Sequence, residues 1–462
     1  MNPKKFFTEY DDNIAGDINL DPLGLLTIWS AFGQKIFRNR ISSISNDVRS
    51  YTLNLFHHHV IRRMVGDASI MLSPALMKAY STKESLAFKQ VCLIHLENLF
   101  VFSHLQNADE AWVPKAVTGG IFGISKARRR WNAGDGDATL KFSKDDQLLV
   151  RQLLLGVSGR YKTPMVEMGF FDRLYHDGGA RATSLWQEAQ AFIGAQASLK
   201  KLETSLLAHF KQLLAHEGKT PSLLFSEVDA ALKRDYVVAF ASPGSVGSYA
   251  RDYWLRVTDL DRGAAGAILC VLNDDIEQGR EVSASGVFRR ALALLQDAGQ
   301  KADRLQLEHV LAVEPFLTDL DLLFSLMLSK QSNSIDDIVT AWSRYKRDDA
   351  TLPHRATVLK TDTVLCATLA GTALIRLKRL IKLDAGGSMH EQIALLLDYH
   401  KNVMAARGQT SWLAMDCDGK VKVFVPRPAA PAVERRTGTH WANQYYIPQF
   451  ANLARGFKGT QP

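Results

Sequence analysis

The stretch SSISNDVRSYTLNLFHHHVIRRM, Ser42 to Met64, decides the fold class of this chain. At about 100° per residue, a helix over this stretch has apolar side chains on two opposite faces. One face consists of Val48, Tyr51 and Leu55, and the other of Leu53, Phe56, Val60 and Met64. A helix with two apolar faces has to be enclosed by other helices. The stretch therefore predicts a helical bundle with this helix inside it.

Three consecutive histidines, His57 to His59, lie in the middle of the expected helix. Adjacent helical positions spread over about 200°, so three neighbouring imidazoles cannot converge on one metal ion. Helical metal pairs need a spacing of three or four, and the residues at those offsets, Val60 to Arg63, are not ligands. We therefore expect three buried histidines, with neither a metal site nor a cofactor.

Apolar residues recur at three- and four-residue spacing along most of the chain, and alternating strand patterns are almost absent. The expected helices are Asn46–Met64, Lys83–Leu105, Lys144–Leu155, Ser184–Glu217, Leu223–Ala239, Gly286–Ala298, Ala302–Lys330, Ile335–Tyr345, Thr361–Leu383 and Ser388–Arg407. One hairpin is expected in WLAMDCDGKVKVFVPRP (Trp412 to Pro428), where Asp418-Gly419 separates two short runs. The predicted fold class is mainly α, with multi-helix bundle domains, a small C-terminal β-hairpin and an arm.

Clusters of glycine and proline predict the domain borders. We expect an N-terminal helical domain over residues 1–180 and a second helical domain over residues 181–408. The hairpin and a basic, aromatic C-terminal arm occupy residues 409–462.

Composition limits the class of protein. The chain has 462 residues, of which 46% are hydrophobic, so it can bury a large core. Its N-terminus turns acidic before any apolar run, and its longest nearly apolar run, Val364 to Ile375, is far below the roughly 20 residues of a membrane-spanning helix. The four cysteines are scattered without a Cys-x-x-Cys pair. These features predict a cytoplasmic protein with no membrane partner.

The net charge of +8 favours acidic partners such as nucleic acid, and the clustering of that charge indicates where they would bind. In GGIFGISKARRRW (Gly119 to Trp131), a glycine turn precedes Lys126, Arg128, Arg129, Arg130 and Trp131. Arginine forks and a stacking tryptophan suit a phosphate backbone or an unpaired base. The alternative is a solvated loop whose cations pair with acids elsewhere.

Two further basic clusters lie near the C-terminus. RLKRLIK contributes Arg376 and Arg379, although a charged outer helix face would explain them without function. The arm combines basic and aromatic residues, namely Arg435, Arg436, Trp441 and Tyr445. These residues either contact a nucleic acid strand or a partner, or they pack the arm back onto the bundle.

No catalytic signature is present. The chain lacks a Gly-x-Ser-x-Gly elbow, a His-Glu-x-x-His motif and a phosphate-binding loop. Asp416, Asp418 and Lys420 resemble the carboxylates and lysine of metal-dependent nucleases, yet the predicted turn accounts for all three. We expect no catalytic residues.

Three segments resemble a family of uncharacterised, mostly helical proteins encoded in bacterial anti-phage defence gene clusters. The first, DPLGLLTIWSAFGQKIFRNRISSISNDVRSY, has an apolar helix and a polar turn with Ser43, Ser45 and Arg49. The others are GGIFGISKARR with LLVRQLLLGVSGRYKTPMVEMGFF, and RGQTSWLAMDCDGKVKV near the end. The chain has Arg38-Asn39 where that family has Pro-Gly. The resemblance implies a defence-system component that acts beside a helicase or nuclease subunit.

Together these observations predict a non-catalytic, DNA-associated subunit of an anti-phage defence or restriction complex. Two alternatives stay open. One is a pure assembly scaffold whose tail inserts into a partner subunit. The other is a nuclease with a dispersed metal site.

Overall fold

The structure is a computed structural model that describes residues 21–110, 114–218, 220–426 and 428–459. Helix dominates these residues and strands are confined to two small sheets, so the predicted mainly α fold is confirmed. The chain forms two compact units. Unit 1 holds the described residues up to Ile36 together with Ala284–Tyr445, and unit 2 holds Phe37–Ser283 together with the described residues from Tyr446 onward.

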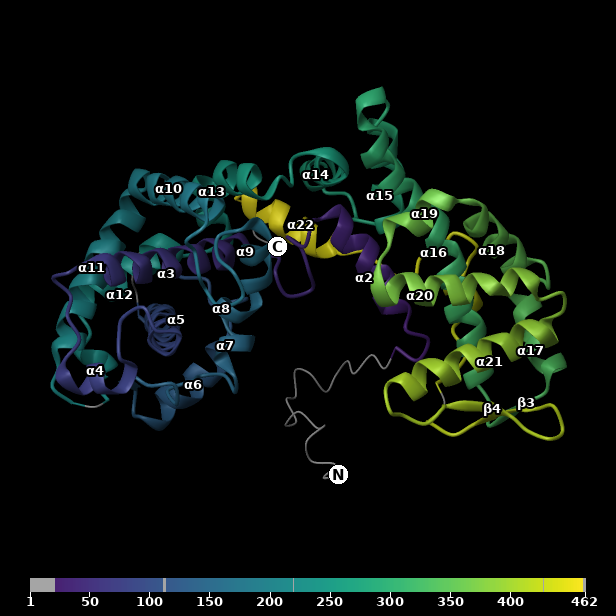
Figure 1. Ribbon diagram of the computed structural model, residues 1–462, viewed down its shortest axis with the longest axis horizontal. Helices are drawn as coiled ribbons and strands as arrows, with labels where there is room; N and C mark the ends of the chain where they lie inside the picture. The colour runs from purple at the N-terminus through teal and green to yellow at the C-terminus, as the bar shows by residue number, and fades with distance from the viewer. Residues whose placement is uncertain (1–20, 111–113, 219, 427, 460–462) are drawn as a thin grey trace. The chain divides into compact units, whose positions relative to one another are not determined.

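Unit 2 is a helical bundle around one central helix, α5, which Figure 1 views along its axis. Helices α3, α6, α7 and α12 contact α5. A two-stranded antiparallel sheet, β1 with β2, lies in the same unit. The elements of unit 2 are α3 (Val48–Gly66), α4 (Pro74–Tyr80), α5 (Leu86–Asp109), α6 (Ile124–Ala133), β1 (Thr139–Lys141), α7 (Gln152–Leu155), α8 (Val157–Arg160), α9 (Lys162–Met168), α10 (Ala180–Ala195), α11 (Ala197–Ala215), β2 (Ser222–Leu224), η2 (Phe225–Glu227), α12 (Ala230–Phe240), α13 (Pro243–Thr258), α14 (Gly263–Glu277) and α22 (Ile447–Phe457).

Helix α3 confirms the prediction from the opening stretch. It begins after Asp47, whose side chain accepts a hydrogen bond from the Ser50 amide at 3.0 Å and so caps the first turn. Apart from its C-terminal end, every residue of the helix is buried, including His57 to His59. The helix is therefore enclosed on all sides, as two apolar faces require.

Helix α5 is the one helix among the described residues that is long and apolar enough to cross a membrane by length and composition. Its most apolar window is 78% buried inside the protein. Most of the helix therefore packs in the core of unit 2.

The C-terminal helix α22 packs in unit 2 against α13, α14 and α3. Glycines make the crossing with α13 possible: a Cβ atom on Gly247 would overlap the carbonyl oxygen of Gly456, and one on Gly244 would lie 2.7 Å from the Gly459 oxygen. Two backbones can approach this closely only where neither carries a side chain.

Unit 1 is built around the long helix α16, which contacts α2, α15, α17 and α18. A three-stranded antiparallel sheet has the order β3-β5-β4, with Leu413 opposite Val423 and Asn333 opposite Val421. The predicted hairpin is thus confirmed and gains a third strand. The elements of unit 1 are α2 (Leu25–Ile36), α15 (Ala284–Leu294), η3 (Ala298–Gln300), α16 (Lys301–Leu328), β3 (Ser332–Asn333), α17 (Ile335–Arg344), α18 (Thr351–Thr361), α19 (Thr363–Thr368), α20 (Gly371–Leu380), η4 (Ile381–Ala385), α21 (Met389–Ala406), β4 (Leu413–Met415), β5 (Val421–Val423) and η5 (Val433–Arg435).

The division into units differs from the three domains drawn at residues 180 and 408. The chain enters unit 1, passes into unit 2 at Phe37, returns at Ala284 and passes back at Tyr446. Gly178 and Gly179, which marked the first expected border, directly precede α10 inside unit 2. Glycine clusters therefore mark the ends of helices here and do not mark the borders of units.

Several predicted helices were wrong in extent. The helix expected over Lys144–Leu155 is reduced to the single turn of α7. The Leu148 amide donates to Oε1 of Gln152 at 2.7 Å and the Gln152 amide donates to Oε1 of Gln147 at 2.6 Å, so side chains replace the helical acceptors. The long helix expected over Ser184–Glu217 is broken at Gln196.

Candidate nucleic-acid interface

One buried guanidinium group holds the glycine turn before α6 in place. Arg49 is 1% exposed, and it donates hydrogen bonds to the carbonyls of Val117 at 2.6 Å and Gly119 at 2.7 Å. Gly123 then takes the left-handed conformation, with φ of +84°, and starts the helix without a side-chain cap. The first turn of α6 therefore offers amide donors that no side chain occupies.

Three of the predicted contact residues on α6 are exposed, namely Lys126, Arg128 and Arg129. Lys126 and Arg129 form no ion pair with a described residue, and Arg128 lies 3.5 Å from the carboxylate of Asp109, with both partners about half exposed. Such an exposed pair holds the side chain weakly. A shallow hollow of about 500 Å³ lies beside them, lined by Gly119 and by both arginines. This is an open cationic surface over glycine backbone.

The other two predicted contacts on α6 point into the protein. Arg130 pairs with the buried carboxylate of Asp146 at 2.7 Å and also donates to the carbonyl of Thr139. Trp131 is half-buried, with its ring centroid 6.1 Å from Phe102 and 5.8 Å from Phe225. These two residues attach α6 to the bundle, so the prediction that Trp131 stacks on a base is not supported.

The second basic cluster divides in the same way. Arg376 donates to the carbonyl of Gly24 at 3.0 Å and to the hydroxyl of Thr27, which connects α20 to the start of α2 within unit 1. Arg379 is exposed and lines a separate hollow of about 150 Å³ with Lys382. Arg376 therefore acts in the fold, and Arg379 belongs to a charged outer helix face.

The arm up to Tyr445 is packed onto unit 1, so its aromatic residues follow the second of the two alternatives, packing back onto the bundle. Trp441 is 8% exposed and Tyr445 is 1% exposed, and both rings pack against Phe288. Arg436 pairs with Asp321 at 2.7 Å, whereas Arg435 is exposed. A base cannot stack on Trp441 or Tyr445 unless the arm leaves this packing, and a tail that inserts into a partner would have to leave it as well.

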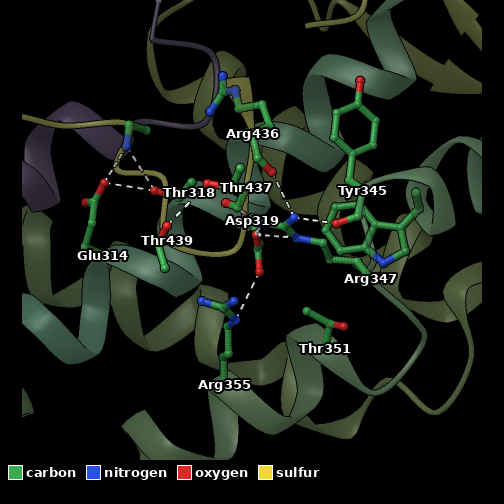
Figure 2. Close-up of polar contacts among 12 residues, drawn as sticks. Glu314, Thr318, Asp319, Tyr345, Arg347, Thr351, Arg355, Arg436, Thr437 and Thr439 are labelled. Carbon is green, nitrogen blue, oxygen red and sulfur yellow. Dashed lines mark hydrogen bonds and ion pairs between the residues drawn. The ribbon is translucent and has the colours of Figure 1, made fainter. Parts of the chain in front are cut away.

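A buried polar cluster clamps the arm, as Figure 2 shows. Asp319, which is 1% exposed, lies between the guanidinium groups of Arg347 at 3.1 Å and Arg355 at 3.0 Å. Arg347 also donates to the carbonyls of Arg436 at 2.9 Å and Thr437 at 3.1 Å. Burial raises the pKa of Asp319, and the two guanidiniums oppose that shift. The cluster thus connects α16 to the arm backbone.

Glu314, one turn earlier on α16, is a second anchor for the arm. It is fully buried, and burial raises its pKa while its hydrogen bonds oppose the shift. One of its oxygens accepts hydrogen bonds from the amides of Ala442 at 2.6 Å and Asn443 at 3.0 Å, and the other accepts from Trp29 at 2.6 Å and Tyr445 at 2.8 Å. These donors hold the arm at Ala442 to Tyr445, and α2 at Trp29, against α16.

The three histidines of α3 are buried, as predicted. The ring of His57 lies 3.2 Å from the Tyr236 hydroxyl, and the ring of His59 lies 3.2 Å from the Glu203 carboxylate. Burial lowers the pKa of His57 and of His58 to about 3. Within the described part of the chain, no group of three or more His, Cys, Asp or Glu side chains has an arrangement that could hold a metal ion. The four cysteines are unpaired.

The turn of the hairpin engages one of the two predicted carboxylates, that of Asp416, whereas the side chain of Asp418 is exposed. Oδ1 of Asp416 accepts hydrogen bonds from the amides of Asp418 at 3.0 Å and Lys420 at 2.8 Å, and Oδ2 lies 3.3 Å from the ammonium of Lys422. The local structure of the hairpin therefore explains Asp416.

Sequence reasoning missed the residues that fix the arm, above all Glu314, Asp319 and Arg347. Acidic residues at 314 and 319 interrupt the apolar pattern of α16, and that interruption was the available signal for buried polar groups. Their partners lie up to 131 residues away in the chain, so no local pattern identifies them.

Comparisons with protein-family models, with curated proteins and with solved structures find no match.

Proposed function

We propose that this protein is a non-catalytic, nucleic-acid-associated subunit of a bacterial anti-phage defence or restriction complex, and that it binds duplex DNA through α6. The observation that carries the binding is the set of exposed cations, Lys126, Arg128 and Arg129, on one helix beside a glycine-lined hollow. The place in a defence complex, beside a helicase or nuclease subunit, rests on the resemblance of the sequence segments.

The chemistry of the α6 surface suits a phosphodiester backbone. Arginine presents a planar fork of N–H donors that matches two phosphate oxygens, and lysine adds a mobile point charge. The uncapped first turn of α6 contributes backbone N–H groups and the positive end of the helix dipole at the same place. Cations that form no hydrogen bond inside the protein are available for such contacts. Lys126 and Arg129 are therefore better candidates for phosphate contact than the other predicted residues.

A salt titration tests the proposal. Binding of a fluorescent duplex is measured by anisotropy across a range of salt concentrations, for the wild type and for the triple variant Lys126→Ala, Arg128→Ala, Arg129→Ala. Loss of each phosphate contact should flatten the slope of log K against log salt by about 0.9, and by up to about 2.7 for three contacts. The affinity at low salt should fall together with the slope.

A matched triple variant separates this surface from a general loss of charge. Lys200, Lys211 and Arg234 are exposed cations on other helices of unit 2, and changing them to alanine removes the same formal charge. We expect the control to keep the wild-type slope. If both triple variants lose equal slope, or if neither does, α6 is not the DNA-binding surface.

A further inference from the structure

A pocket of about 270 Å³ opens in unit 2, away from α6, between the C-terminal half of α3, the start of α5 and the first turns of α10. Its walls are mostly apolar and aromatic, with Leu93, Phe171, Tyr175 and Trp186. Cavities of about 150 Å³ with such walls accept a benzene ring. This pocket therefore has room for a two-ring aromatic system that carries a substituent.

One wall of the pocket is an imidazole without a partner. His58 is 7% exposed, and its ring lies 4.7 Å from Phe171 and 5.3 Å from Tyr175, centroid to centroid. Neither ring nitrogen has a hydrogen bond to a described residue, and Nε2 is also closed to solvent. A ligand in the pocket would therefore meet the other ring nitrogen, Nδ1, which has no hydrogen bond to a described residue and to which a polar edge could bond.

The pocket also contains an unpaired cation. The ammonium group of Lys89 lines it and forms no hydrogen bond or ion pair with a described residue. Burial and the charge of Arg62 lower the pKa of Lys89, and the exposed carboxylate of Glu84 opposes that shift. Arg62 itself is engaged, because it pairs with Asp177 and lies 4.9 Å from the Trp186 ring centroid. Lys89 is thus the group that an anionic substituent would contact.

We infer that this pocket binds a flat, two-ring aromatic molecule that carries one anionic group. The rings would lie against Tyr175 and Trp186 with a polar edge toward His58, and the anionic group would lie at Lys89 near the mouth. Two sources share this chemistry, a purine nucleoside monophosphate and an aromatic carboxylate. The inference is independent of DNA binding, because the pocket and the α6 surface share no residue.

Isothermal titration of the full chain tests the inference with adenosine monophosphate, guanosine monophosphate, 2-naphthoate and the neutral 2-naphthylmethanol. We expect one of the anionic probes to bind in a one-to-one ratio and to change the fluorescence of Trp186. The same change should be absent in Trp186→Phe. The probe that binds more tightly identifies the source.

Variants locate the ligand. Lys89→Met should weaken the anionic probe at least tenfold and leave any affinity for the neutral probe unchanged, whereas Lys200→Met, a matched change on the exposed face of α11, should have no effect. His58→Phe keeps an aromatic ring in place and should weaken binding severalfold. The triple variant of α6 should bind the probe normally. The inference is overturned if no anionic probe binds at millimolar concentration, or if Lys89→Met binds as tightly as the wild type.

Discussion

Lowering the pH should unfold unit 2, because its core contains imidazoles that cannot be protonated without leaving their sites. Burial lowers the pKa of His57 and His58 to about 3 and that of His209 to about 4. In the unfolded chain these groups titrate near pH 6.5, so below that pH the unfolded state binds more protons than the folded state. These histidines therefore leave the free energy of unfolding unchanged above pH 6.5. They lower it as the pH drops toward their pKa values in the folded protein.

The size of the effect follows from proton linkage. Near pH 5.5 an unfolded histidine is roughly 90% protonated, so each buried neutral histidine lowers the free energy of unfolding by about 1.2 kcal/mol per pH unit. The three histidines together account for roughly 3 to 4 kcal/mol per pH unit. Since whole domains have about 5–15 kcal/mol of stability, unit 2 should unfold near pH 5. Urea denaturation followed by circular dichroism at half-unit pH steps measures the slope.

Buried carboxylates change the pH dependence of stability in the opposite direction, because burial raises the pKa of Glu97. The contribution of a single histidine therefore has to be measured separately. His58→Phe removes no hydrogen bond from the protein, and it should reduce the slope between pH 6 and pH 5 by about 1.2 kcal/mol per unit. His354→Phe, at an exposed position in unit 1, is the matched control and should keep the wild-type slope. An unchanged slope in His58→Phe would show that this ring is not held neutral, and the reasoning would be refuted.

Two further predictions concern packing, and both are measured as shifts in the denaturation midpoint. Gly247→Ala places a methyl group against the Gly456 carbonyl and should destabilise unit 2 by about 1–3 kcal/mol, whereas Gly194→Ala, in open space on α10, should be neutral or stabilising by up to about 1 kcal/mol. Equal effects at the two glycines would contradict the close helix crossing. Arg347→Met leaves Asp319 with one guanidinium and should destabilise unit 1 by about 3–5 kcal/mol. The loss should shrink in an Asp319→Asn background, and additive losses would disprove the coupling.

The sequence was sufficient for the fold class because helical periodicity depends only on neighbouring residues. The two-faced pattern of α3 required burial on all sides, and the structure has it. Helix ends were harder to predict. Backbone amides that donate to the side chains of Gln147 and Gln152 ended a helix that its apolar pattern favours, and another expected helix broke at Gln196, two residues after Gly194. Such competition is decided by a few hydrogen bonds, each worth only about 1 kcal/mol.

The borders of the units could not be predicted from the sequence, and the reason is different. Strand β3 follows α16, yet it pairs with β5 about 90 residues later, and α22 packs in unit 2 after the chain has built unit 1. Both are long-range pairings. Composition shifts and glycine clusters report on local chain direction only, so they cannot reveal which distant segment completes a core.

The structure leaves some of the predicted contact residues exposed and buries others, because the residues of a basic run on a helix cannot all face one way. Arg128 and Arg130 lie about 200° apart around the helix axis, so when the first faces solvent the second faces the bundle, where it finds Asp146. Arginine serves both positions, since its five N–H donors satisfy buried carboxylates and backbone carbonyls as well as phosphates. Arg49, Arg347 and Arg376 all donate to carbonyl oxygens and stabilise the fold in this way.

The cations that remain for a nucleic acid are those whose donors find no acceptor inside the protein. On α6 these are Lys126 and Arg129, and Arg128 is held only loosely by Asp109. Under the proposed DNA binding, single substitutions should therefore follow that order, with Arg129→Ala flattening the salt slope and Arg130→Ala lowering stability instead.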